Sequence, residues 1–241
     1  MNAASSPKVA AFQVYLGLNG SQEDLKLPSN NYFLYKSNEA TAADDYLRLS
    51  ADEAVKYGCP PFIYVTFPSA KDPKWDDRHP GVSTCQLITI TNPEWFEQFR
   101  DKSTKKSQKR LNKDDYLQLK NAFAEIMIER LSELFPQYAK EIIFSESSTS
   151  ISQQYYMQND YGELYALPHT VDRFKSDIWT ELRHECDIPG LILSGQDVMF
   201  CGVTSALHNG LLTAQAILKG DLLKDLDKAI RLQTENVNKS E

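Results

Sequence analysis

The sequence predicts an α+β protein, in which an antiparallel sheet with helices is followed by a C-terminal strand, turn and helix. Short segments rich in β-branched and aromatic residues recur along the first half of the chain, which is typical of strands. A long pattern of helical spacing follows them. Near the end, an apolar stretch from 188 runs through a Ser-Gly-Gln-Asp turn into a segment rich in Ala, Leu and Gly that reaches Leu218.

Segments with strand composition are separated by Pro- and Gly-containing turns, so we expect them to pair mainly antiparallel. They are residues 9–16, 31–35, 62–67, 85–90 and 142–144.

Helices are expected at three further places. Residues 42–49 fit a short helix. Apolar residues recur at three- and four-residue spacing over 114–135, which predicts a long amphipathic helix that Pro136 ends. Residues 171–184 carry apolar residues on one helical face and predict another.

Composition excludes several classes of function. A net charge of −7, with no basic stripe, argues against a nucleic-acid partner. The four cysteines and four histidines show no metal-ligand spacing, so no metal site is expected. No apolar run reaches the roughly 18 residues of a membrane span. The Lys- and Arg-rich segment 101–115 fits a solvated connection, or alternatively a patch that faces anionic lipid headgroups.

The C-terminal turn is the first candidate site. A strand that ends in Gly195, Gln196 and Asp197 and enters a helix at Gly202 leaves backbone N–H groups and a positive dipole end at one spot, which suits an anion or an electron-rich ring. Small residues then recur every fourth position as far as Ala214, so a partner could approach closely. The alternatives are a structural turn, in which Asp is a common N-cap, and ordinary close packing.

A tyrosine-rich segment is the second candidate. Residues 155–169 place four tyrosines and His169 around a glycine. Aromatic walls with a few polar tips are what an apolar, rod-like ligand needs. The alternative is an ordinary core boundary with a hydrogen-bonded structural histidine.

With these segments the chain resembles the phytoene desaturase and carotenoid isomerase group of flavin-dependent, amine-oxidase-like proteins, and within it the members that saturate retinol. The block from Phe67 to Pro73, Phe-Pro-Ser-Ala-Lys-Asp-Pro, is the most specific part of the likeness. The chain departs from the group in two small ways, because Phe200 stands where Thr is usual and Asn209 where Gly is general. The residues that carry the resemblance are 15–25, 67–75, 93–97, 134–137 and 194–212.

The resemblance implies a substrate-binding domain over 9–186, a flavin-contacting strand-turn-helix over 187–220 and a polar tail over 221–241. The Gly-x-Gly-x-x-Gly element that binds the ADP part of FAD is missing, so the chain resembles a C-terminal portion that lacks the N-terminal FAD-binding half. By resemblance, Gly195, Gln196, Asp197 and Gly202 contact the flavin.

The implied reaction reduces the 13,14 double bond of all-trans-retinol or a similar polyene, with Tyr165 or His169 as proton donor and NADPH or NADH as a possible electron source. The implied location is the surface of the endoplasmic reticulum membrane. Alternatives are a carotenoid isomerase or desaturase, and a non-catalytic module that binds a retinoid or another polyene.

Overall fold

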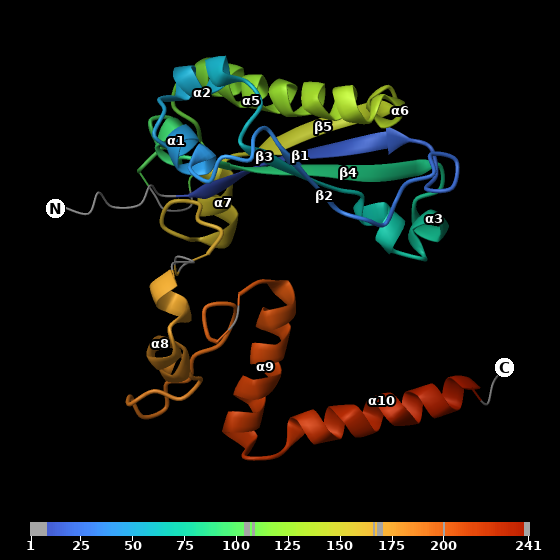
Figure 1. Ribbon diagram of the computed structural model, residues 1–241, viewed down its shortest axis with the longest axis vertical. Helices are drawn as coiled ribbons and strands as arrows, with labels where there is room; N and C mark the ends of the chain where they lie inside the picture. The colour runs from blue at the N-terminus through green and yellow to red at the C-terminus, as the bar shows by residue number, and fades with distance from the viewer. Residues whose placement is uncertain are drawn as a thin grey trace. The chain divides into compact units, whose positions relative to one another are not determined.

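The structure, a computed structural model, describes residues 9–103, 107, 109–165, 167, 171–199 and 201–238. The chain divides into two compact units, Met1–Leu164 and Tyr165–Glu241. Figure 1 shows the sheet and the long helix α5 in the first unit, and helices α8 to α10 in the second.

The first unit is built on an antiparallel sheet, which confirms the predicted α+β class. The strands lie side by side in the order β2-β3-β4-β1-β5, and each paired strand runs antiparallel to its neighbour. All five predicted segments form strands. They are β1 (Ala10–Asn19), β2 (Tyr32–Tyr35), β3 (Phe62–Thr66), β4 (Val82–Thr91) and β5 (Ile142–Ser148).

Helices cover one face of this sheet. The predicted long helix is α5, and Figure 1 shows it lying along the sheet on the same side as α2 and α6, whereas α3 and α7 lie on the other side, toward opposite ends. The helices of this unit are α1 (Ala42–Leu47), α2 (Ala51–Tyr57), η1 (Pro68–Lys71), α3 (Trp75–Arg78), α4 (Glu94–Glu97), α5 (Lys113–Leu134), α6 (Pro136–Ala139) and α7 (Ser150–Met157).

The hydrophobic core lies between the sheet and α5. Alternate residues of β1 point into it, because side chains along a strand alternate between the two faces, and Phe12, Val14 and Leu16 are all at most 2% exposed. Phe123 of α5 stacks on Trp95 with ring centroids 5.3 Å apart and contacts Phe12 at 5.7 Å. The other face of the sheet points away from α5 and lies outside this core.

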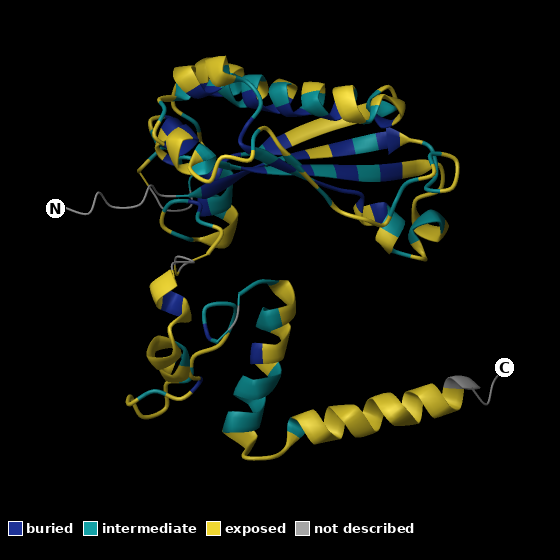
Figure 2. Ribbon diagram, viewed as in Figure 1, coloured by how far each residue is buried: buried dark blue, intermediate teal, exposed yellow. Residues whose placement is uncertain are grey.

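The second unit is mostly helical. It contains η2 (Val171–Phe174), α8 (Ser176–Glu181), α9 (Val203–Leu218) and α10 (Leu222–Asn238). The single helix predicted over 171–184 is wrong in its extent, because Lys175 has extended backbone angles (φ −69°, ψ 146°) that separate η2 from α8. The segment expected as a polar tail forms α10, whose described side chains are nearly all exposed (Figure 2).

The strand predicted just before the Ser-Gly-Gln-Asp turn is also wrong. The residues from Leu191 to Leu193 form an isolated bridge, between Ile192 and Glu185, and two further backbone bonds. Leu193 N–H donates to the His184 carbonyl at 2.8 Å, and Leu191 N–H closes a turn on the Ile188 carbonyl at 3.1 Å. A strand requires a ladder of such bonds. Within the described residues of this unit, the segment from Leu191 to Leu193 forms no such ladder. No helix within the described ranges is long and apolar enough to cross a bilayer.

Candidate functional site

The face of the sheet that points away from α5 carries a fixed row of side chains. Directly paired residues of antiparallel strands share one face. We call this surface, with its neighbours along each strand, the open face. One such row crosses all five strands and consists of Phe33, Tyr64, Ile88, Gln13 and Ser148.

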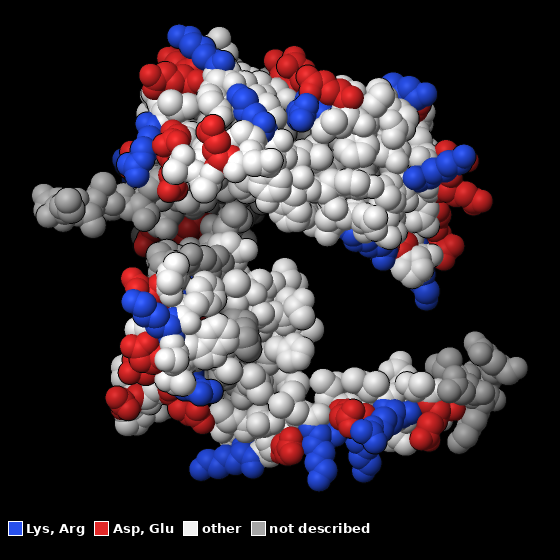
Figure 3. Space-filling view, viewed as in Figure 1, with Lys and Arg blue, Asp and Glu red and all other residues white. Residues whose placement is uncertain are grey.

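One half of the open face is aromatic. Phe33 and Tyr35 of β2 are 58% and 59% exposed, although such rings are usually buried. The Phe33 ring meets Tyr64 edge-on at 5.0 Å, and Tyr35 lies 6.2 Å from Phe62. We call these four residues the aromatic patch. Figure 3 views the first unit from the side of the sheet, and in this view its charged side chains lie mainly around the rim.

The other half of the open face is a network of neutral polar groups. The Tyr15 hydroxyl donates to Gln13 Oε1 at 2.5 Å, and the Gln86 amide donates to the same oxygen at 3.0 Å. Ser148 lies 3.4 Å from the Tyr15 hydroxyl. These hydroxyl and amide groups carry no charge and bond to one another.

A cavity of about 870 Å³ lies beside this network and α7. Its walls include Tyr15 of the sheet and three residues of the predicted tyrosine-rich segment, Tyr155, Tyr156 and Met157. The rings of Tyr155 and Tyr156 meet edge-on at 4.9 Å. The sequence therefore located an aromatic wall, but not the sheet residues that complete it.

An ion pair lies at the rim of the cavity. Lys120 Nζ of α5 lies 2.5 Å from Glu146 Oε1. The hydrogen bond from Lys120, with a second from the Ser147 N–H, lowers the pKa of the Glu146 carboxyl below its usual value. The carboxylate is therefore charged throughout the neutral range and is not suited to donate a proton there.

In the second unit, Asp197 is held within its own loop region. Its Oδ1 accepts a hydrogen bond from the Leu167 N–H at 3.2 Å and lies 3.8 Å from Arg173 Nη1. The Arg173 side chain is 6% exposed, whereas that of Asp197 is 29% exposed. Arg173 Nη2 also donates to the Gln196 carbonyl at 3.4 Å. Asp197 is thus only partly buried and takes part in fixing the turn.

Helix α9 holds the same turn through a polar side chain. Asn209 is fully buried, and its amide donates to the Gly195 carbonyl at 2.9 Å and to the Val198 carbonyl at 2.5 Å. The Thr213 hydroxyl, one turn further on, lies 2.9 Å from the Ser194 hydroxyl. The residue that departs from the related group therefore ties the Gly-Gln-Asp turn to the helix.

The backbone around this turn is open to close approach. Gly195 and Gly202 have φ of +100° and +92°, a region that favours glycine. A Cβ placed on either residue would meet no described atom within 4 Å. Gly202 is the N-cap of α9, and Val203 after it is 90% exposed. These features fit a group that lies against bare backbone at a helix N-terminus.

Of the two residues predicted as proton donors, the structure describes one. Tyr165 opens the second unit and is 38% exposed. His169 lies outside the described residues, as does Phe200. Both roles remain predictions.

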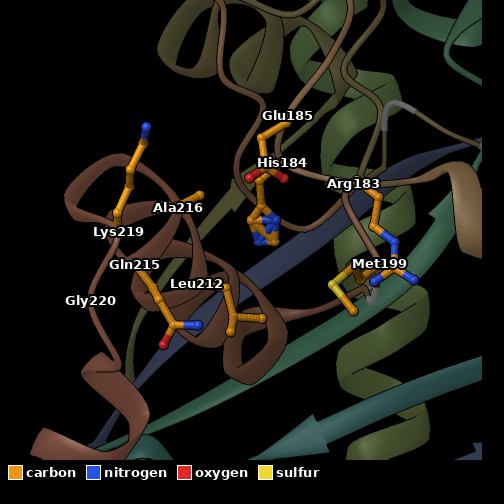
Figure 4. A pocket seen from close by; sticks show the side chains of 9 residues that line it. All are labelled: Arg183, His184, Glu185, Met199, Leu212, Gln215, Ala216, Lys219 and Gly220. Carbon is orange, nitrogen blue, oxygen red and sulfur yellow. The ribbon is translucent and has the colours of Figure 1, made fainter.

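A second cavity, of about 490 Å³, lies within the second unit (Figure 4). His184, which is 5% exposed, points toward α9, from which Leu212 and Gln215 project. Among the described residues, neither His184 Nε2 nor Gln215 Oε1 has a hydrogen-bond partner. Buried polar atoms normally have partners. In this cavity two buried polar atoms lack a hydrogen bond to any described residue.

Comparison with known proteins relates the chain to a class of oxidoreductases named for their action on a retinoid. The particular relatives are named all-trans-retinol 13,14-reductase. The chain is 34% identical to the protein from Danio rerio over 232 residues, which are 95% of this chain and 37% of the relative. It is 35% identical to the Homo sapiens protein over 231 residues, which are 94% of this chain and 37% of that relative.

These matches confirm the resemblance predicted from the sequence, over nearly the whole chain. The chain spans about 37% of the length of these two relatives. Another Danio rerio protein, 29% identical over 227 residues, is named inactive all-trans-retinol 13,14-reductase. No family model matches the chain.

The aromatic patch was missed at the sequence level. Its signal is visible in retrospect in strand β3, where Phe62 and Tyr64 alternate with the buried Ile63 and Val65. Alternation of one apolar set with another does not reveal which face is solvent-exposed, so the sequence predicted the strand and not its exposed aromatic side.

Proposed function

We propose that the chain is the substrate-binding part of a flavin-dependent enzyme that reduces the 13,14 double bond of all-trans-retinol or a similar polyene. The open face of the sheet is the observation that carries the proposal. An aromatic patch that is more than half exposed on β2 offers a flat apolar surface, which a conjugated chain can cover. The 34% and 35% identity to all-trans-retinol 13,14-reductases supports this substrate class.

In this proposal the residues of the first unit bind and orient the polyene. The rings of Phe33, Tyr35 and Tyr64 exclude water from one side of it. Phe33 stacks on Tyr35 and meets Tyr64 edge-on, and these contacts hold the rings in place. Tyr155 and Tyr156 close one end of the surface. Holding a flexible ligand in one orientation is itself a large part of the rate acceleration that an enzyme supplies.

The proposal assigns FAD to the turn of the second unit. Gly195 and Gly202 would allow the group to lie against the backbone, while Gln196 and Asp197 would lie beside it. When bound, a flavin supplies two-electron chemistry to a conjugated double bond. The chain's own contribution there is the positive end of α9, which favours negative charge near Gly202. Tyr165 and His169 are the residues proposed to supply a proton.

The proposal also includes an electron source and a location. NADPH or NADH would refill the flavin, and the membrane surface of the endoplasmic reticulum would supply the apolar substrate. The resemblance to the flavin-dependent group supports both. Amphipathic α10 is the described element best suited to such a surface, since Leu223, Leu226 and Ile230 are 41 to 53% exposed.

Retinol binding tests the substrate assignment. The chain is titrated with all-trans-retinol, and binding is followed by retinol fluorescence. We expect saturable binding that Phe33→Ser weakens about tenfold or more, because a large apolar contact is lost. Phe174→Ser, which removes a 47% exposed phenylalanine from the other unit, serves as the matched control and should leave binding unchanged. Equal loss in both variants contradicts the assignment of the open face.

Flavin binding tests the second part separately. The chain is co-expressed with the remaining length of the Danio rerio reductase, and the purified complex is examined for flavin absorbance. We expect bound FAD, and we expect Gly202→Val to remove most of it. Gly190→Val is the control, since Gly190 also has positive φ and open space at its Cβ.

Retinol binding without FAD in any complex would instead favour the non-catalytic binding module. Isomerisation of a carotenoid without reduction would favour the carotenoid isomerase alternative.

A further inference from the structure

Lys71 is held at the border of the open face by two neutral oxygens. Its Nζ donates hydrogen bonds to Asn31 Oδ1 and to Thr66 Oγ1. Thr66 also donates to Asn31 at 2.9 Å, so the three side chains form one cluster. In the described part of the chain, Lys71 forms no ion pair, whereas the neighbouring Asp72 is paired with Arg78. An ammonium with only neutral partners keeps most of its attraction for an anionic or strongly polar group.

The segment before Lys71 fixes its position. Phe67 is fully buried, and Pro68 begins η1. Ser69 is also fully buried and is bonded reciprocally to β4, since its N–H donates to Thr84 Oγ1 at 3.2 Å and its Oγ accepts from the Thr84 N–H at 3.0 Å. These contacts explain the physical role of the Phe-Pro-Ser-Ala-Lys block, which anchors a short helix against the sheet and ends on the lysine.

The cluster lies next to the aromatic patch on the same face. Thr66 follows Tyr64 by two positions on β3, so both side chains point to the open face. Two residues of a strand span about 7 Å, and the distance from Thr66 to Phe62 is about 13 Å. Thr66 is 6% exposed, although it belongs to this face, because η1 and Lys71 cover it. The Lys71 ammonium therefore lies at one end of the aromatic patch.

We propose that Lys71, supported by Thr66 and Asn31, binds the oxygen-bearing end of the polyene while the apolar body lies over the aromatic patch. This inference rests on the proposed function of the open face, and it adds a head-group preference. A carboxylate gains a charge-assisted bond to the ammonium, an alcohol gains a weaker one, and a hydrocarbon gains none. Lys71 is assigned as a binding residue for the substrate end and not for the reacting double bond.

Binding of three polyenes that differ only at the end tests the inference. The full chain and the variants Lys71→Met and Lys71→Arg are titrated with all-trans-retinoic acid, all-trans-retinol and the hydrocarbon 15-deoxyretinol, which has a methyl group in place of the alcohol. We expect Lys71→Met to raise Kd about tenfold for the acid and about two- to fivefold for the alcohol, and to leave the hydrocarbon unchanged. Lys71→Arg should retain most of the acid affinity. Lys74→Met, which removes an exposed lysine three residues away, should change none of the three.

The outcomes distinguish the role of Lys71 from the proposed binding of a polyene by the open face. If all three polyenes bind and Lys71→Met changes them equally or not at all, the head-group assignment is overturned and the open face stands. If none binds, both are overturned. If Lys71→Met does not fold, the wild-type chain decides: acid binding that weakens with salt while hydrocarbon binding does not supports the assignment, and equal salt dependence overturns it.

Discussion

At the scale of single residues, buried polar groups hold the second unit together. Asn209 and Arg173 are at most 7% exposed and donate to backbone carbonyls, and Val198 is the one hydrophobic side chain that is equally buried among the described residues of that unit. Hydrogen bonds to backbone carbonyls therefore stabilise the second unit, whereas apolar packing stabilises the first. Such contacts are specific in direction, and losing one leaves a carbonyl unsatisfied.

Replacing Asn209 should loosen the turn that it holds. We expect Asn209→Ala to destabilise the second unit by about 1 to 3 kcal/mol, because the Gly195 and Val198 carbonyls lose a buried donor. Amide hydrogen exchange over 193–199 measures it, with His208→Ala, an exposed neighbour on α9, as the control. Unchanged protection in Asn209→Ala would show that the turn is held by other contacts.

The ion pair between Lys120 and Glu146 should make a small, pH-dependent contribution to stability. The folded-state pKa of Glu146 is lowered by the bond from Lys120, so this stability is present above the unfolded pKa of about 4.3 and is lost as pH falls through the lower folded value. Because the Glu146 side chain is 58% exposed, we expect less than about 1 kcal/mol.

Thermal unfolding of wild type and Glu146→Gln between pH 7 and pH 2 measures this contribution. The difference in Tm should be largest near neutrality and vanish at the acid end, whereas exposed Glu125→Gln should show no such trend. A difference that grows as pH falls has the wrong sign for this pair.

At the scale of elements, the sequence predicted most of the first unit because local pattern and final environment agree there. The spacing of Phe123, Met127 and Leu131 marks the buried side of α5, and these residues are at most 1% exposed. It failed where non-local contacts decide. A strand at 191–193 has the right composition but finds only one bridge, and Lys175 interrupts the expected helix. The site was predicted in part. Tyr155 and Tyr156 carry a local signal, whereas Lys71 lies in the most specific block of the resemblance but shows no local sign of a binding role.

Helix α2 was not predicted, and its stability should depend on its first residue. Ser50 caps it, since Ser50 Oγ accepts from the Glu53 N–H at 3.3 Å and Glu53 Oε2 accepts from the Ser50 N–H at 2.8 Å. We expect Ser50→Ala to cost about 1 kcal/mol and Ser50→Asp to cost much less, because Asp is also a good cap. Urea unfolding of the two variants gives the comparison, and equal losses would rule out the cap as the cause.

At the scale of the whole molecule, the two units differ in how they are stabilised. The hydrophobic core cluster lies entirely between residues 12 and 151. The second unit instead exposes apolar side chains on α9, including Val203, Leu207 and Leu218, which are 68 to 90% exposed. Exposed apolar surfaces of this kind are typical of sites that contact another protein or a membrane.

The first unit should therefore fold without the second. We expect residues 9–164, expressed alone, to unfold cooperatively with a Tm within a few degrees of the main transition of the full chain, because the core remains whole. Residues 165–238 alone should show helical content without a cooperative transition. Calorimetry of the three polypeptides measures this, and loss of the transition in 9–164 would mean that the core needs the second unit.

The interior position of β1 in the sheet has a consequence for synthesis. Of the five strands of this sheet, β1 leaves the ribosome first, yet its two neighbours are β4 and β5, and the last paired residue of β5 is Ser148. At translation speeds of ~5–20 residues per second, the nascent strand waits on the order of 10 s for its second neighbour. Its apolar residues are exposed to chaperones and to other unfinished chains throughout that interval.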